Sequence, residues 1–328
     1  MSDEDFMDPS DLKKNHWLRW IPQPLLAAVL IWVGSGNGLN HQLEAQEPKQ
    51  YEVRQPPSEL KLPAFYSKYV SATGYPIVGS SRVNDYALKE AAYLIDMMLA
   101  ERPDIRVAMI QSGSRMIVMS HDEYTTDIPE HSHLKPKAYW DARARGLGGS
   151  KTDPVCSSAE ENLLAYRGDP YSTENILIHE FAHNMHYRGM NQIDPTFDDR
   201  LKKAYDHAIA QGRWKDKYAA TNHAEYFAEG VQSWFNNNRP PDSDHNHVDT
   251  REELKQYDPE LAAICEEVYG KTTLVYTKPT TRLHGHMKDY DPATAPMFQW
   301  PKEIQARKNK DRAATQQQDS NEDLDSSR

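Results

Sequence analysis

The sequence predicts an α+β fold, in which a small sheet precedes a helical half. Two β-leaning runs, Arg106–Ile110 and Arg115–Ser120, flank a turn at 111–114 that contains a glycine, which predicts a hairpin at the edge of the sheet. Apolar residues at helical spacing predict helices over 83–101, 172–188, 197–211, 222–236 and 252–269, the last with a break near Pro259. A small sheet followed by several helices is the α+β arrangement.

The first 45 residues have the order of a secretory signal. Lys13, Lys14 and Arg19 precede an apolar stretch over 21–33, and small and polar residues follow it. The stretch is shorter than the ~20 apolar residues of a membrane-spanning helix, which favours a cleaved signal over a signal anchor or a buried helix. We therefore predict a secreted or periplasmic protein that meets a membrane only through an uncleaved anchor.

Two polar segments border a single predicted domain. Residues 46–63 carry four prolines with little apolar periodicity, which is typical of an extended linker. Residues 301–328 are charged, rich in glutamine and almost free of large apolar side chains, which predicts a disordered tail. The folded domain is expected over 64–300.

The composition excludes several classes of protein. A mean hydropathy of −0.83 excludes a polytopic membrane protein, and a net charge of −11 repels nucleic-acid phosphates. The two cysteines, Cys156 and Cys265, form no C-x-x-C pair, which excludes a cysteine-ligated zinc module. In an oxidising compartment they can pair only with each other, so we expect this disulfide, with two buried free thiols as the alternative.

The helix predicted over 172–188 carries the pattern H-E-x-x-H. His179 and His183 are four residues apart, so their side chains lie on one face of the helix and can bind one metal ion. Glu180 lies beside this face, where it can hold a metal-bound water without being a ligand. Packing alone does not readily explain why an otherwise apolar helix carries two histidines and a carboxylate.

A third zinc ligand is expected on a second helix. The pattern H-E-x-x-H-x-x-G-x-x-H would need glycine at 186, where this chain has His186. A downstream glutamate is the other common solution, and the helix predicted over 222–236 offers Glu225 and Glu229 on one face. Both can also be solvated charges on an amphipathic helix. His186 and His223 are expected behind the ligands or at the surface, because three better-placed groups are available.

The two motifs together resemble a family of secreted zinc metallopeptidases that includes the anthrax lethal factor catalytic domain and the bacterial Pro-Pro endopeptidases. In that family a tyrosine stands seven residues before the ligand glutamate, in the run Y-x-x-T-N-x-A-E-x-F-A-E, which this chain matches from Tyr218 to Glu229. The resemblance covers residues 172–236 alone. It implies a zincin-like fold, with Glu225 as the third zinc ligand, Tyr218 as the active-site phenol and Glu229 as a partner behind the ligands.

These motifs predict a zinc-dependent endopeptidase with one Zn²⁺ per chain and a protein or peptide substrate. Glu180 is the expected general base, and Tyr218 the expected hydrogen-bond donor to the oxyanion. The hairpin expected over 106–120 offers an edge that can align an extended substrate by strand addition. Two alternatives remain at this stage: a non-proteolytic zinc-binding module of a surface or cell wall, and a zinc hydrolase that acts on a non-peptide bond.

Overall fold

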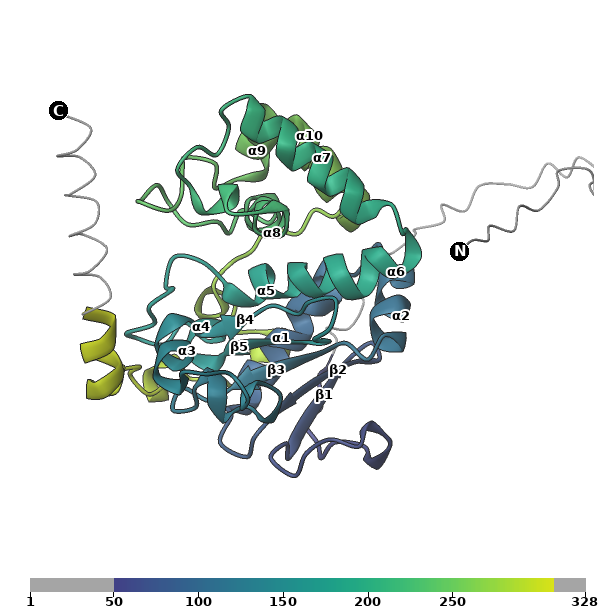
Figure 1. Cartoon of the computed structure of the whole chain (residues 1–328). Helices are drawn as coiled ribbons and strands as arrows, with labels where there is room; N and C mark the ends of the chain where they lie inside the picture. The colour runs from purple at the N-terminus through teal and green to yellow at the C-terminus, as the bar shows by residue number, and fades with distance from the viewer. Residues whose placement is uncertain (1–49, 310–328) are drawn as a thin grey trace, which may run out of the picture. The chain divides into compact units, whose positions relative to one another are not determined.

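The computed structural model describes residues 50–309, which belong to one compact unit. The signal predicted over 1–45, the start of the linker and the tail beyond residue 309 lie outside the described residues. A five-stranded sheet is followed by a mostly helical half, so the prediction of an α+β fold is confirmed (Figure 1). None of the helices between residues 50 and 309 is long and apolar enough to cross a membrane.

The sheet is mixed, with three parallel strands at its centre and an antiparallel strand at each edge. The central strands run β2, β3, β5 in space, while β1 pairs antiparallel with β2 and β4 pairs antiparallel with β5. The strands are β1 (Lys68–Ala72), β2 (Tyr75–Gly79), β3 (Arg115–Met119), β4 (Gly146–Leu147) and β5 (Val155–Ala159). The two edges of the sheet are therefore β1 and the short strand β4.

Both faces of the sheet are covered. Successive side chains of a strand point to opposite faces, and in β3 Met116 and Val118 join the main core while Ile117 and Met119 join a smaller cluster. Helices α1 and α5 contact the strands on the side of the main core. Strands buried on both faces are continuous apolar runs, which is why β3 reads as MIVM without alternation.

The predicted hairpin is wrong. Residues 106–110 lie in helix α2 (Pro103–Gln111), and β3 is parallel to its neighbours β2 and β5. Pro103 occupies the first helical turn, and Ile105 and Met109 are buried at a spacing of four residues. Parallel strands need a crossover, which here is made of helices, so no hairpin turn joins β2 to β3. Since β3 has a neighbour on each side, it has no free edge to align a substrate.

The predicted helices are present, with some differences in length. The helix expected over 172–188 begins at Ile176 and continues past Asn184 as a π-helix, Met185–Met190. The break expected near Pro259 separates α9 from α10. The bounds are α1 (Asp85–Met98), α3 (Lys137–Arg143), α4 (Glu160–Leu163), α5 (Ile176–Asn184), α6 (Asn191–Ile193), α7 (Phe197–Ala210), α8 (His223–Trp234), α9 (Arg251–Tyr257) and α10 (Pro259–Tyr269).

Helix α8 is the centre of the helical half. It packs against α5 on one side and against α7, α9 and α10 on others, as Figure 1 shows. The fully buried carboxylate of Asp258 joins α8 to the residues around Trp214, because its Oδ2 accepts hydrogen bonds from Trp214 Nε1 and from the Tyr226 hydroxyl, both at 2.9 Å. Its Oδ1 accepts from the backbone N–H of Leu261 at 3.2 Å and so caps the start of α10.

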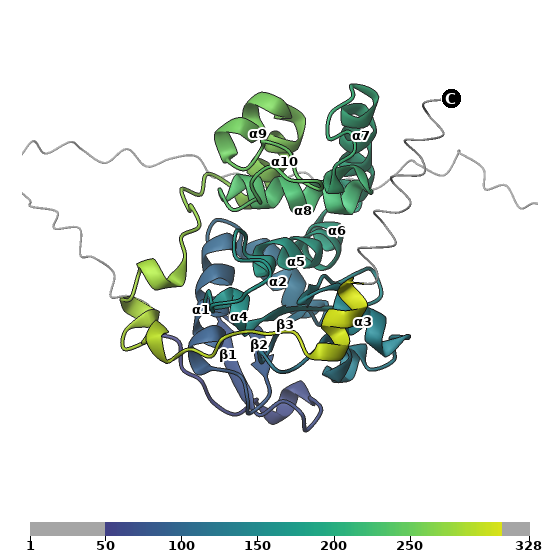
Figure 2. The ribbon, with the colours of Figure 1, turned by 90° about the vertical axis from the view of Figure 1, so that its left-hand side faces the viewer.

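The segment over 271–301 returns from α10 to the first half of the domain. It follows α1 and leads to a helix over 302–309 beside α3 (Figure 2). The fully buried carboxylate of Glu90 on α1 accepts a hydrogen bond from Arg282 at 3.0 Å and lies 2.7 Å from His286 Nε2. Through Arg282 and His286, this segment stabilises the buried carboxylate of Glu90 on α1.

Two segment predictions need correction. Residues 50–63 are part of the folded unit, because Tyr51 is buried and donates a hydrogen bond to Asp96 at 3.0 Å. Arg54 also pairs with Tyr69 of β1. The segment expected to be disordered from residue 301 is helical over 302–309, where Lys308 donates to the carbonyl of Ala142. Prolines with little apolar periodicity were the basis of the linker prediction, and a charged composition with few large apolar residues was the basis of the tail prediction. Contacts of Tyr51 and Lys308 with the folded domain outweigh these signals here.

The expected disulfide is not formed. Cys156 and Cys265 are both free and buried. Cys156 lies in β5, where its Sγ is 3.9 Å from Met116 Sδ, whereas Cys265 lies in α10. Each thiol acts as a small apolar side chain of the main core, which is the alternative considered above.

We predict that Asp258→Ala destabilises the domain strongly. The substitution leaves the buried donors of Trp214 and Tyr226 without an acceptor and removes the cap of α10, so we expect the free energy of unfolding to fall by about 3 kcal/mol. Urea unfolding monitored by circular dichroism measures this. Glu266→Ala on the exposed face of α10 is the control, with a change within about 0.5 kcal/mol. Equal stability of the two variants would contradict the role of Asp258.

Candidate metal centre

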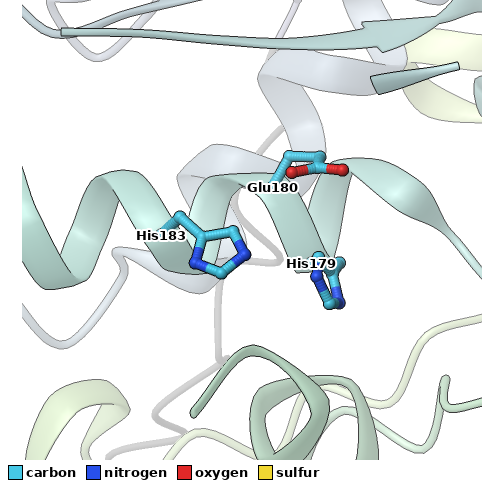
Figure 3. A group of neighbouring side chains, drawn as sticks. All are labelled: His179, Glu180 and His183. Carbon is cyan, nitrogen blue, oxygen red and sulfur yellow. The ribbon is translucent and has the colours of Figure 1, made fainter. Parts of the chain in front are cut away.

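Helix α5 presents the two histidines of H-E-x-x-H from one side. Asn175 caps the helix by accepting a hydrogen bond from the N–H of Ile178. Figure 3 shows His179 and His183 projecting together from α5, with Glu180 on a different side of the helix. The two imidazole centroids are 5.1 Å apart. The two histidines thus lie on one face of α5, as their i, i+4 spacing predicts.

Glu225 meets both imidazoles. Its Oε2 lies 3.1 Å from His179 Nε2 and 3.4 Å from His183 Nε2. Asn222 caps α8 by accepting from the N–H groups of Ala224 and Glu225, so Glu225 stands in the first turn of its helix. The first turn is where a helix favours a negative charge.

The convergence of these three groups fits a zinc ion. Imidazole nitrogen and carboxylate oxygen are zinc ligands, and bonds of ~2.0–2.2 Å in a tetrahedron separate ligand atoms by roughly 3.4 Å. Glu180 is a second carboxylate in reach, because its ligand atom and those of the two histidines lie within 4.8 Å of one another. Glu225 is the better-placed candidate for a third ligand, because its oxygen contacts both Nε2 atoms directly.

The pKa shifts also indicate a place for a cation. Burial acts to lower the pKa of His179, but the hydrogen bond to Glu225 and the nearby carboxylates outweigh it and raise that pKa to about 10. Burial would raise the pKa of Glu225, yet its contacts with His179 and His183 hold it well below the usual range. Positive charge is therefore stabilised between these side chains, whether a proton or a metal ion supplies it.

All six residues predicted for the site line one cavity of about 1040 Å³: His179, Glu180, His183, Tyr218, Glu225 and Glu229. Burial raises the pKa of the Glu180 carboxyl, although both histidines oppose this shift. Burial and the charge of Glu225 also raise the pKa of the Tyr218 hydroxyl, which keeps it protonated. The cavity thus contains a carboxyl with a raised proton affinity and a phenol that remains a hydrogen-bond donor.

The contacts behind His179 differ in part from the prediction. Glu229 Oε1 is 3.5 Å from His179 Nδ1, but Gln232 Oε1 is closer, at 2.8 Å. The Gln232 amide in turn donates to Glu174 Oε2 at 2.8 Å, and Glu174 is ion-paired with Arg239. Gln232 lies seven residues after Glu225, on the same face of α8, and this helical spacing is the signal that would have found it.

Strand β4 and the residues after it approach α5 very closely. A Cβ atom at Gly148 would lie 2.5 Å from Cδ2 of His183, so any side chain there would displace the imidazole. At Gly146 a Cβ would lie 2.6 Å from Ile176 Cγ2. Residues 146–149 also line the cavity. Gly146 and Gly148 are thus required for close packing of the sheet edge on the H-E-x-x-H helix.

No protein-family model matches this chain, and no curated protein matches it. Among solved structures, the chain is similar to the Pro-Pro endopeptidase PPEP-2 from Paenibacillus alvei, with 17% sequence identity and a TM-score of 0.33. The match covers 59% of this chain and 96% of the other. A similarity of this extent carries no argument about fold or activity.

We predict that Gln232→Met weakens zinc binding. The substitution keeps the approximate volume but removes the acceptor that orients His179, and loss of such a partner typically costs 10–100-fold in metal affinity. Competition with a chromophoric chelator measures the dissociation constant. Gln192→Met, at an exposed position of α6, is the matched control and should leave it unchanged. Parental affinity in Gln232→Met would show that Gln232 does not orient the ligand.

Proposed function

We propose that this protein is a zinc-dependent endopeptidase. The observation that carries the proposal is the contact of one Glu225 oxygen with the Nε2 atoms of both histidines, 3.1 and 3.4 Å away, in a cavity that also contains Glu180. His179, His183 and Glu225 are the proposed zinc ligands, one ion per chain. Three protein ligands leave a fourth position for water or substrate, as in catalytic zinc sites.

Each remaining residue of the cavity has a proposed task. When bound, the zinc ion supplies Lewis-acid polarisation of a carbonyl and a water that is acidic near neutral pH. Glu180 accepts the proton of the attacking water and delivers it to the leaving amine, and its raised pKa suits a group that must hold a proton in turn. Tyr218 donates a hydrogen bond to the carbonyl oxygen as that oxygen gains negative charge.

A peptide is the proposed substrate because of the strand at the cavity wall. Edge strand β4 lines the cavity together with Glu180 and the histidines, and its outer edge has no neighbouring strand in the described sheet. An extended peptide can pair with such an edge through main-chain hydrogen bonds. This places the proposed strand addition on β4 instead of the segment over 106–120.

The cavity favours an enzyme over a non-proteolytic zinc-binding module. A blocked site would leave no room at the carboxylate, whereas Glu180 lines about 1040 Å³ of open volume. Analysis of the products distinguishes a peptidase from a zinc hydrolase that acts on a non-peptide bond. We also propose export of the protein, on the sequence of residues 1–45 alone.

We predict that Glu180→Gln separates catalysis from metal binding. The variant should keep one zinc per chain in this site and lose about 10²–10⁴-fold in turnover, since only the proton acceptor is removed. Glu225→Ala should lose the zinc of this site and, with it, the turnover. A peptide-library digest read by mass spectrometry, with and without chelator, reports turnover, and elemental analysis reports zinc. Equal metal loss in the two variants would contradict these roles, and chelator-resistant cleavage would contradict the metallopeptidase.

A separate prediction concerns the phenol. Tyr218→Phe should keep zinc and lower kcat by about 10²-fold with little change in KM, because the hydrogen bond is made mainly in the transition state. Steady-state kinetics on one cleaved peptide measures this split. Tyr139→Phe on the exposed side of α3 is the control. A rise in KM at unchanged kcat would assign Tyr218 to substrate binding instead.

A further inference from the structure

A second group of two histidines and a carboxylate lies beside the cavity. His186 comes from the π-helix after α5, Asp198 from the first turn of α7, and His223 is the first residue of α8. Asp198 Oδ1 lies 2.8 Å from His186 Nε2 and 3.1 Å from His223 Nε2. One ligand atom of each residue lies within 4.8 Å of the other two.

This group repeats the geometry of the first site. In both sites one carboxylate oxygen contacts two imidazole Nε2 atoms from different turns or helices, at 3.1 and 3.4 Å in one and at 2.8 and 3.1 Å in the other. An ion in the second group would need these atoms to move apart by roughly 0.3–0.6 Å to reach tetrahedral separations. Side-chain rotation of His223 and Asp198, each about one quarter exposed, can supply that movement.

The surroundings of His186 also suit a ligand. Its imidazole is fully buried and enclosed by Tyr187, which stacks on it at 4.1 Å, and by the rings of Phe197 and Phe227. The polar edge of the ring that carries Nε2 faces Asp198, and this apolar enclosure fixes its direction. A π-helix is a rare element that often occurs at functional sites, and here it carries the buried histidine.

We propose that His186, Asp198 and His223 bind a second divalent transition-metal ion, for which zinc is the best fit. Two imidazoles and one carboxylate are ligands that zinc accepts, and the partial exposure of His223 and Asp198 leaves room for a water as the fourth ligand. A calcium or magnesium ion would require mainly oxygen ligands. The site does not depend on the proposed peptidase activity.

Two features make this site the weaker of the two. Lys151 donates to the other oxygen of Asp198 at 2.8 Å, so a positive charge stands near the ion. His186 Nδ1 has no hydrogen-bond partner within residues 50–309, whereas His179 Nδ1 has Gln232. A ligand histidine without such a partner binds metal less tightly. The Lys151 side chain is 65% exposed, so it can turn away from Asp198.

The second ion would cross-link three helical elements. It would join the continuation of α5 to the starts of α7 and α8. His223, its ligand on α8, lies two residues before Glu225. Two of these helices, α5 and α8, also carry the proposed ligands of the first site. Binding there would stabilise the folded state by mass action, as for any ligand of the native form.

The test is the zinc content of the full chain in buffers of fixed free zinc, by elemental analysis. The parent should bind two ions, His223→Gln one, His183→Ala one, and the double variant none. His207→Gln, which removes an exposed histidine of α7 outside the group, should still bind two. Lys151→Gln should bind the second ion at least as tightly as the parent. Circular dichroism checks that each variant is folded, and Asp198→Asn replaces His223→Gln if that variant unfolds.

The outcomes separate the two sites. One ion in the parent that is lost in His183→Ala and kept in His223→Gln would overturn the second site and leave the proposed function intact. One ion lost in His223→Gln and kept in His183→Ala would support the second site and overturn the first. Two ions in the parent and also in both His223→Gln and Asp198→Asn would overturn the second site, since the extra zinc would then bind elsewhere.

Discussion

The carboxylate of Glu225 is the point at which the two halves of the site are joined. Its Oε2 lies between imidazoles of α5, while its backbone belongs to the first turn of α8. Removing a carboxylate from water is costly unless charge and hydrogen bonds replace the water, and the two imidazoles do so here. The relative position of α5 and α8 is therefore set by an electrostatic requirement as well as by apolar packing.

Several layers of structure support that contact. Asp258 fixes α10 and the residues around Trp214 on α8, and Asn222 sets where α8 begins. On the other side, Gly148 lets the sheet edge reach His183. Behind His179, the chain from Gln232 to Glu174 and Arg239 holds the imidazole in one orientation. The side chains of the candidate metal centre are thus positioned by the sheet, by the helix core and by a polar network.

The structure brings the predicted site residues together in one cavity, whereas it contradicts part of the predicted sheet. A short-range pattern predicted that His179, Glu180 and His183 lie together, and the Tyr218–Glu229 run predicted residues that the structure brings into the same cavity. The residues over 106–110 were misassigned, because a short run of β-branched and apolar residues fits a strand and a helix equally well. Only the parallel pairing of β2 with β3 decides between them, and that pairing is a long-range property.

Gln232, Gly148 and the free cysteines show the same limit at the level of single residues. A glutamine on a buried helix face has many uses, and its contact with His179 depends on how two helices pack. Close approach of Gly148 to an imidazole requires the strand and helix to be placed first. Cysteine pairing depends on distance in the folded chain, and β5 and α10 carry the two thiols in different parts of the core.

The contacts of Glu90 with Arg282 and His286 can form only late in translation. Glu90 is fully buried on α1, and its partners lie 192 and 196 residues later in the sequence. At ~5–20 residues per second, a ribosome needs roughly 10–40 seconds to synthesise that interval. During this time the carboxylate lacks its native partners Arg282 and His286. The buried contacts of Glu90 on α1 are therefore completed only after the helical half has been made.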